Sequence, residues 1–270
     1  MAKYKKKRAR ELRHDKFRDT TMGLVDRAAH RMEGKGRKFL YALGALLVIG
    51  LLAWGIMAWR GNKANNARLA LGRAIEIAEA PIIATPVPGT TGPSFRTEKE
   101  RSQKAVEEFQ KVAASYGGTT GEHARYFAAT HQLVLDRAKG MAELDALTRS
   151  SDGEVATLAK FALAQAKEGE TKYEEAAALY SELAKQSSTI ITPDTVNLRL
   201  ALVYKQLGKK QEAADILFRI VEASRQTKGK DGKPAPQFGA VRKAADELEK
   251  IDPARYAQLP PPPPPSNLAM

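Results

Sequence analysis

The feature that most constrains this chain is a run of 21 residues without a charged side chain, Phe39 to Trp59. As an α-helix rising about 1.5 Å per residue, the run would be roughly 30 Å long, which matches the hydrocarbon core of a bilayer. Ten of its residues are Leu, Ile, Val or Phe, whose transfer into a membrane is favourable. The run therefore predicts a membrane-spanning helix.

A cleaved signal peptide is the alternative interpretation, because it also places an apolar segment after basic residues. Its apolar region is usually about 7–15 residues long and is followed by a small-x-small cleavage site. Here the apolar run is longer, and the residues after it are Arg60-Gly-Asn-Lys. We therefore expect the span to be retained as an anchor.

The basic residues are concentrated before the span. The chain has 44 Lys and Arg residues against 31 Asp and Glu, and residues 1–38 hold 14 of the basic residues but only five acids. Lys and Arg that flank a span stay in the cytoplasm, so we expect a cytoplasmic tail and a C-terminal domain outside the cytoplasm. The tail could also contact anionic lipid, the ribosome or nucleic acid, because each attracts basic residues through phosphate.

From residue 98 onward, segments with helical patterning alternate with short breaks, and none shows the period-two alternation of a strand. Four segments align on an alanine with spacings of 37, 34 and 37 residues, at Ala105, Ala142, Ala176 and Ala213. Paired helices with a period near 34 residues are typical of tetratricopeptide repeats. The sequence therefore predicts an all-α fold, a single transmembrane helix followed by a tetratricopeptide-repeat α-solenoid.

The most regular repeat, residues 200–220, resembles the tetratricopeptide family at nearly every signature position. A small residue in the second helix of each pair allows two helix backbones to approach closely where they cross. The residues predicted to pack the repeats together are Ala105, Ala142, Ala176, Tyr180, Ala201, Tyr204, Gly208, Ala213 and Leu217. The inner groove of such a solenoid binds protein segments. In the most regular repeat, Leu198, Leu202 and Lys205 are predicted to face that groove.

These patterns divide the chain into five parts. They are a basic cytoplasmic tail (1–38), the transmembrane helix (39–59), a membrane-proximal helix and Pro-rich loop (60–97), the repeat domain with a C-terminal capping helix (98–251), and a Pro-rich disordered tail (252–270). The tail contains six consecutive prolines, Pro260 to Pro265. Such a run forms a stiff polyproline II helix that aromatic-lined grooves can bind, so a docking motif is the alternative to simple disorder.

The sequence contains no motif of a known catalytic site. It has no cysteine, and it has none of the P-loop, nucleophile-elbow or dinucleotide-binding patterns. The two histidines of the predicted repeat domain, His123 and His131, are eight residues apart and belong to no HExxH pattern. We therefore expect no enzyme activity, no cofactor and no metal site.

In the order of its parts, the chain resembles the YfgM-like ancillary subunits of the SecYEG translocon. The resemblance covers residues 39–251 and rests on the basic tail, the single early span, the helix leading out of it, about four repeats and the absence of cysteine. It implies a bacterial inner-membrane protein whose repeats bind proteins in the periplasm, with the translocon or periplasmic chaperones as partners. The expected function is assistance in export, folding or envelope-complex assembly.

Two other functions stay open at the level of sequence. One is a structural subunit or assembly factor of another envelope complex. The other is a ribosome or nucleic-acid tether that acts through the basic tail, whose binding would weaken steeply with salt.

Overall fold

The computed structural model describes residues 36–83, 92–186, 188–227 and 239–262. Their secondary structure is helical, apart from one isolated bridge between Ile82 and Phe95. The predicted all-α fold is therefore confirmed for the described ranges. Most of the predicted basic tail, the middle of the predicted Pro-rich loop and the last eight residues lie outside them. The chain divides into two units, Met1–Asn65 and Asn66–Met270.

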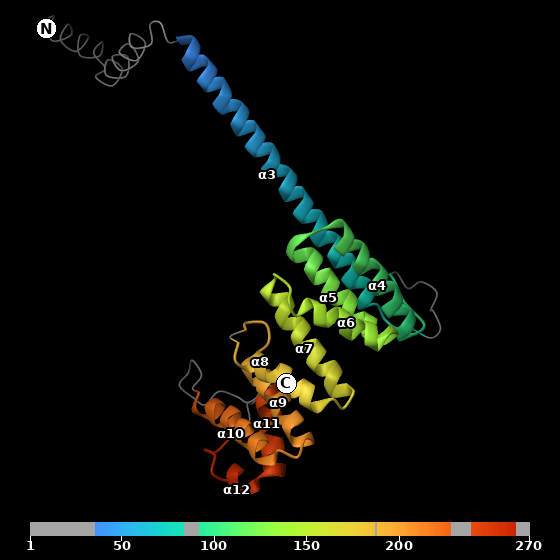
Figure 1. The fold of residues 1–270 in the computed structure, drawn as a ribbon, viewed down its shortest axis with the longest axis vertical. Helices are drawn as coiled ribbons and strands as arrows, with labels where there is room; N and C mark the ends of the chain where they lie inside the picture. Colours follow the sequence, from blue (N-terminus) through green and yellow to red (C-terminus); the bar gives the residue numbers. More distant parts are fainter. Residues whose placement is uncertain (1–35, 84–91, 187, 228–238, 263–270) are drawn as a thin grey trace, which may run out of the picture. The chain divides into compact units, whose positions relative to one another are not determined.

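The first described element is α3, a single helix from Gly36 to Ala78 (Figure 1). It includes the whole predicted span, residues 39–59, and the boundary between the two units lies within it. In unit 1, the side chains from Tyr41 to Ala58 are all exposed. In that unit α3 thus has no buried face of its own.

In unit 2, the same helix has a buried stripe. Ala67 and Ala74 are buried, and partly buried Ala70 and Leu71 lie between them, at the i, i+3, i+4, i+7 spacing of one helix face. Ala70, Leu71 and Ala74 of this stripe lie in one core cluster with residues of α4 (Glu98–Ser115) and α5 (Gly118–Leu135). The predicted membrane-proximal helix is therefore the C-terminal part of α3.

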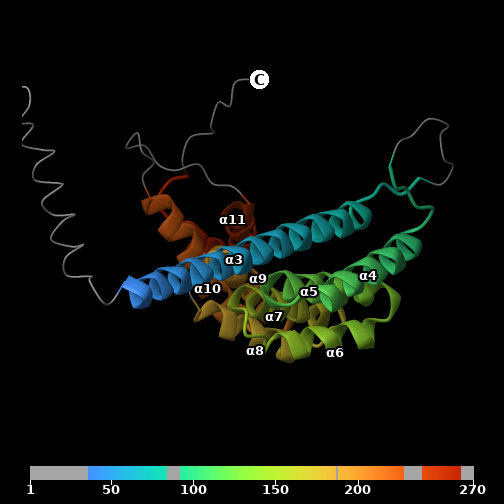
Figure 2. The same cartoon turned by 90° about the horizontal axis from the view of Figure 1, so that it is seen from above.

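The chain continues as a succession of helices, visible from two directions in Figure 1 and Figure 2. After α4 and α5 these are α6 (Arg137–Leu147), α7 (Gly153–Gly169), α8 (Tyr173–Ala184), α9 (Pro193–Gln206), α10 (Lys210–Gln226), α11 (Gly239–Ile251) and α12 (Pro253–Tyr256). From α4 onward each helix packs against the next one along the chain, and α5 also contacts α7 and α9 also contacts α11. Most contacts are therefore between sequence neighbours.

Side-chain caps show why several of these helices begin where they do. The first backbone N–H groups of a helix have no partner within it, and Ser, Thr or Asp at the preceding position can accept their hydrogen bonds. A side-chain oxygen does so at Thr97, Asp136, Asp152, Thr192 and Asp252. The local sequence therefore fixes the starts of α4, α6, α7, α9 and α12.

The helices α4, α6, α8 and α10 each contain the same pattern of three buried residues. In each helix a small residue is followed by a large one four positions later and by another large one three positions after that. The triplets are Ala105, Phe109 and Val112; Gly140, Leu144 and Leu147; Ala176, Tyr180 and Leu183; and Ala213, Leu217 and Ile220. The small residues are 35, 36 and 37 residues apart, so every second helix buries the same pattern.

The prediction that Ala142 packs α6 was wrong, because Ala142 is exposed. The small buried residue of α6 is Gly140, two positions earlier. A Cβ atom on Gly140 would lie only 2.6 Å from the backbone nitrogen of Leu133 in α5. Aligning the segments on alanine missed this position because the closest approach of the two helices leaves no room even for a methyl group.

The other predicted packing residues differ in their surroundings. Ala201 is buried, Tyr204 is half-buried, and Tyr180 is buried with its hydroxyl 3.1 Å from a carboxylate oxygen of Glu168. Gly208 does not pack between helices. It is exposed, and its φ of 74° lies in the left-handed region that glycine adopts easily, directly after α9 ends.

Candidate functional site

The most unusual surface of the described residues is the apolar part of α3 in unit 1. Large apolar side chains are exposed on all sides of this segment, among them Trp54 at 71% and Met57 at 74%. A helix that is apolar all round is normally buried in a large protein or a membrane. By length and composition, α3 is the one described helix that could cross a membrane.

The groove predicted at α9 is not open. Leu198 is buried in the core cluster, so the prediction that it lines a groove was wrong, and Leu202 is half-buried against the same cluster. Lys205 donates a hydrogen bond from Nζ to Oε2 of Glu247 in α11 at 2.6 Å. Leu198 and Leu202 pack into the core cluster that α9 shares with its neighbours, and α11 packs against α9, where Glu247 engages Lys205.

The contact between Lys205 and Glu247 is electrostatically favourable. Glu247 also accepts a hydrogen bond from Lys250 at 3.1 Å. The hydrogen bond from Lys205, with a smaller contribution from Lys250, holds the pKa of the Glu247 carboxyl below its usual value. Lys205 is therefore engaged within unit 2 and is not available as a free ligand-binding cation.

A cleft of about 360 Å³ lies among α4, α5 and α6. Aliphatic side chains from all three helices form much of its lining: Ala113, Ala128, Ala146 and Leu147. Polar side chains complete the lining: Gln110, Glu122, Arg125, Glu143 and Ser150. The combination of apolar surface with a few polar groups is typical of binding sites. This cleft, which we call the α4–α6 cleft, is the candidate functional site of unit 2.

The two carboxylates that line the α4–α6 cleft differ in whether they already have hydrogen-bond partners. Glu122 accepts hydrogen bonds from Nη1 of Arg125 at 2.7 Å and from Oγ of Ser150 at 3.0 Å, so both of its oxygens are engaged. Glu143 is half-buried, and its carboxylate has no partner among the described residues. A ligand could therefore pair with Glu143 without breaking an existing contact.

Two other hollows are weaker candidates. One, of about 260 Å³, lies between α9 and α10 and is lined by Asp194, Asn197, Ile216, Arg219, Ile220 and Ala223. The other, of about 490 Å³, lies between the start of α7 and the segment that joins α8 to α9. Its lining is mainly polar, so it offers little apolar surface to a partner.

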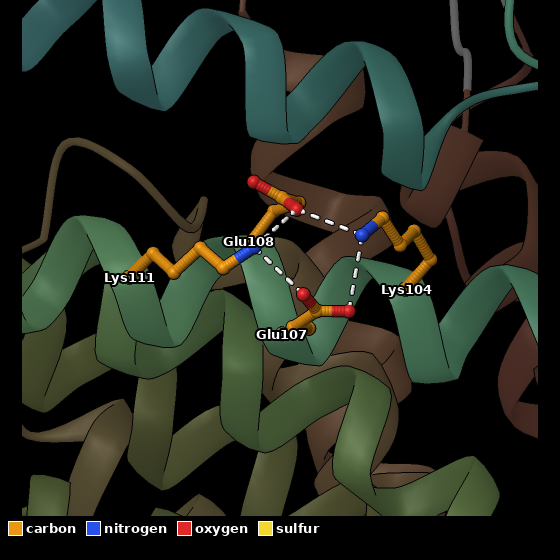
Figure 3. Close-up of polar contacts among 4 residues, drawn as sticks. All are labelled: Lys104, Glu107, Glu108 and Lys111. Carbon is orange, nitrogen blue, oxygen red and sulfur yellow. Dashed lines mark hydrogen bonds and ion pairs between the residues drawn. The ribbon is translucent and has the colours of Figure 1, made fainter.

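The exposed face of α4 carries a network of ion pairs, shown in Figure 3. Lys104 and Lys111 each contact both Glu107 and Glu108, at distances of 2.6 to 3.0 Å. The hydrogen bond that Lys111 donates to Glu107 is the main reason why the pKa of Glu107 lies below its usual value. The hydrogen bond that Lys104 donates to Glu108 is the main reason why the pKa of Lys104 lies above its usual value. Because opposite charges are matched here, this face does not attract a charged partner strongly.

The two histidines of unit 2 are placed differently from each other. His131 lies with Nδ1 3.5 Å from Oγ of buried Ser102 and its ring stacked on Phe109, and burial lowers its pKa. His123 has Nε2 4.0 Å from a carboxylate oxygen of Glu154. Within the described ranges, no three His, Asp or Glu side chains are arranged to hold a metal ion.

No protein-family model, curated protein or solved structure matches this chain. Its function must therefore be inferred from its own surfaces, of which the apolar segment of α3 and the α4–α6 cleft are the strongest candidates.

Sequence reasoning found the first of these surfaces and missed the second. The cleft depends on the register of α6, and the alignment on Ala142 shifted that register by two residues. Had Gly140 been taken as the packing residue, Ala146 would have fallen outside the buried triplet, which is Gly140, Leu144 and Leu147. The sequence does contain a small packing residue in α6, but it was taken to be Ala142 instead of Gly140.

Proposed function

We propose that this chain is a single-pass inner-membrane protein that holds a tetratricopeptide-like scaffold outside the cytoplasm, where it binds protein partners near the translocon during export, folding or envelope-complex assembly. The observation that carries the proposal is the segment from Tyr41 to Ala58, which is helical, uncharged and exposed on all sides. In water such a surface would be a strong aggregation liability. In a bilayer it is fully solvated by lipid.

The charge distribution supports the orientation of the anchor. Residues 1–38 carry a surplus of nine basic charges. The positive-inside rule places such a segment in the cytoplasm. Unit 2 then lies on the opposite side, and the absence of cysteine from the chain means that it needs no oxidative folding there.

The recurring triplets support a tetratricopeptide-like arrangement of unit 2. They recur every 35 to 37 residues, and each lies in the second helix of a successive pair. Most helix contacts are with the next helix along the chain, as expected of a repeat protein in which each repeat packs mainly on its neighbours. A scaffold of this kind offers extended surfaces for partners rather than a single catalytic pocket.

The α4–α6 cleft is the surface on which we place the partner. Its occupant is an amphipathic segment of another protein, with aliphatic side chains against Ala128 and Leu147 and a Lys or Arg against Glu143. The aliphatic contacts supply affinity because they remove apolar surface from water. The basic group supplies selectivity because Glu143 has no partner within the described part of the chain.

Site-specific photocrosslinking in cells tests this function. A photoreactive residue at Ala146, which is exposed in the cleft, should form adducts with the translocon, with periplasmic chaperones or with exported chains. The matched control is the same residue at Gln211, which is exposed at the start of α10 and should give none of these adducts. A Glu143→Lys substitution should lower the adduct yield from Ala146 several-fold, whereas Glu249→Lys on α11 should not.

Equal adducts from both positions, or none from Ala146, would contradict partner binding at the cleft. Recovery of a single unrelated stable complex from Ala146 would contradict the translocon part of the proposal. That result would favour a structural subunit of another envelope complex.

A further inference from the structure

A histidine lies at the junction where the C-terminal part of α3 packs with α4 and α5. The half-buried ring of His131, in α5, stacks on the fully buried ring of Phe109 in α4, with 6.0 Å between the ring centroids. Its Nδ1 is 3.5 Å from Oγ of Ser102, also in α4, which is 1% exposed. Phe109 belongs to the same core cluster as Ala74 of α3. His131 therefore packs on the cluster that holds α3 in unit 2.

The charged side chains that act on His131 both belong to α4. The positive charge of Arg101 disfavours a protonated imidazole, whereas Glu98 favours it to a smaller extent. Arg101 is itself poorly neutralised, because its Nη2 is 4.0 Å from a carboxylate oxygen of Glu98 and its buried Nε has no hydrogen-bond partner among the described residues. Within the described ranges, no charged side chain of α3, α5, α6 or α7 forms an ion pair or hydrogen bond with the imidazole. A proton on His131 therefore meets a cation that lacks a close carboxylate.

The same arginine holds the chain just beyond the end of α3. Nη1 of Arg101 donates a hydrogen bond to the carbonyl oxygen of buried Ala80 at 3.3 Å. The helix α4 thus holds the last part of α3 at two places, through the core cluster around Phe109 and through Arg101. Both side chains interact with His131, one by ring stacking and the other electrostatically.

We propose that His131 is an acid-sensitive switch at this junction, and that its protonation loosens the packing of α3 on α4 and α5. Removing a charged imidazole from water costs free energy, and the nearby guanidinium of Arg101 adds electrostatic repulsion. The neutral ring has neither cost. The packed arrangement therefore favours the neutral ring, and an acidic medium favours a looser arrangement in which the ring is hydrated.

The direction of the pH dependence follows from these causes. Burial, with a smaller contribution from Arg101, lowers the pKa of His131 in the folded state below its usual value of 6.5. As the pH falls below 6.5, the opened state takes up a proton before the packed state does, so the free energy of opening decreases. The contribution to stability is complete above that value and is lost as the pH falls through the folded-state pKa.

The junction also adjoins the α4–α6 cleft. Ala113 and Ala128 pack in the core cluster of the junction and also line the cleft. Loosening at acid pH should therefore weaken partner binding there, a consequence that rests on the proposed function. The switch itself does not, since it needs only residues of unit 2.

Hydrogen exchange of the detergent-solubilised full-length chain, followed by mass spectrometry, tests the switch. Between about pH 7.5 and about pH 5, a range that includes the titration of histidine, the ratio of intrinsic to observed exchange rates should fall several-fold for residues 67–80 and 98–115. His131→Gln, which keeps a neutral polar side chain, should remove this fall, and the matched control His123→Gln should retain it. Peptides from α9 and α10 should respond alike in the parent and His131→Gln.

A second measurement reports on the packed imidazole itself. In a full-length chain whose other three histidines are replaced by Gln, the nuclear magnetic resonance signal of the His131 ring should titrate below pH 6.5. Titration at or above that value, an equal response of the parent and His131→Gln, or loss of the response in His123→Gln would each overturn the proposal. Failure of the proposed function would show instead as missing crosslinks from Ala146, with the exchange result unchanged.

Discussion

Gly140 sets the distance between α5 and α6, since a side chain at this position would meet the backbone of Leu133. A Cβ atom would lie 2.6 Å from the nitrogen and 2.9 Å from the Cα of Leu133. These are backbone atoms, so they cannot move aside as a flexible side chain could. The α4–α6 cleft is built on the same helix contact.

Substituting Gly140→Ala should therefore lower the free energy of unfolding of unit 2 by about 1–3 kcal/mol, as overpacking does. Urea unfolding followed by circular dichroism measures the change. The control is Gly153→Ala at the start of α7, where an added Cβ meets nothing within 4 Å and stability should stay the same or rise. Equal stabilities of the two variants would contradict the close approach of α6 to α5.

Glu247 should make the free energy of unfolding depend on pH, and the direction of that dependence follows from its pKa shift. Its pKa is lowered in the folded state, mainly by the hydrogen bond from Lys205. A carboxyl group with a lowered folded-state pKa stabilises the fold above its unfolded-state pKa, which is about 4.5 for Glu247. That contribution is lost as the pH falls below this value and through the folded-state pKa.

A Glu247→Gln variant should be less stable than the parent at pH 7, by no more than about 1 kcal/mol for a partly exposed pair. The difference should shrink as the pH is lowered from 5 to 3, because the parent loses the same interaction. Unfolding curves at several pH values measure it, and Glu249→Gln, which is exposed on the same helix, should show no such convergence. A constant difference at every pH would argue that packing, not charge, is responsible.

At the scale of elements, the sequence predicted helices better than it predicted what covers them. The sequence predicts a helix at the end of the repeat domain, and α11 lies there, but its sequence does not reveal which face of α9 it contacts. The contact between Lys205 and Glu247 shows that α11 lies against the face of α9 that carries Lys205. Helical periodicity identifies an apolar face, whereas the neighbour on that face is decided by tertiary packing.

The helix α3 takes part in both roles that we propose, membrane anchoring by its apolar segment and support of the partner-binding unit 2 by its C-terminal part. It remains helical across the boundary between the units, and its residues from Ala70 onward pack with α4 and α5. No loop separates the apolar segment from the first packed turn of unit 2. The segment that we propose as the membrane anchor therefore belongs to the same helix that packs with α4 and α5 in unit 2.

A flexible Gly-Ser segment inserted between Gly61 and Asn62 should separate these roles. The apolar segment is left intact, so the variant should remain in the membrane fraction. Crosslinks from Ala146 to membrane-embedded partners should fall, since the insertion uncouples unit 2 from the apolar segment. Unchanged crosslinking would mean that the span serves only as an anchor.

At the scale of the whole molecule, the proposed function requires that α3 crosses the membrane with unit 2 outside the cytoplasm. The chain contains no cysteine, so a single introduced cysteine is its only thiol. Thr20→Cys places that thiol in the basic tail, and Ser151→Cys places it at an exposed position of unit 2. A membrane-impermeant maleimide applied to intact bacterial cells with a permeabilised outer membrane then reports which side each position occupies.

The account predicts that Ser151→Cys is labelled at once, and that Thr20→Cys is labelled only after the inner membrane is broken. Labelling of Thr20→Cys in intact cells, or protection of Ser151→Cys until lysis, would contradict it.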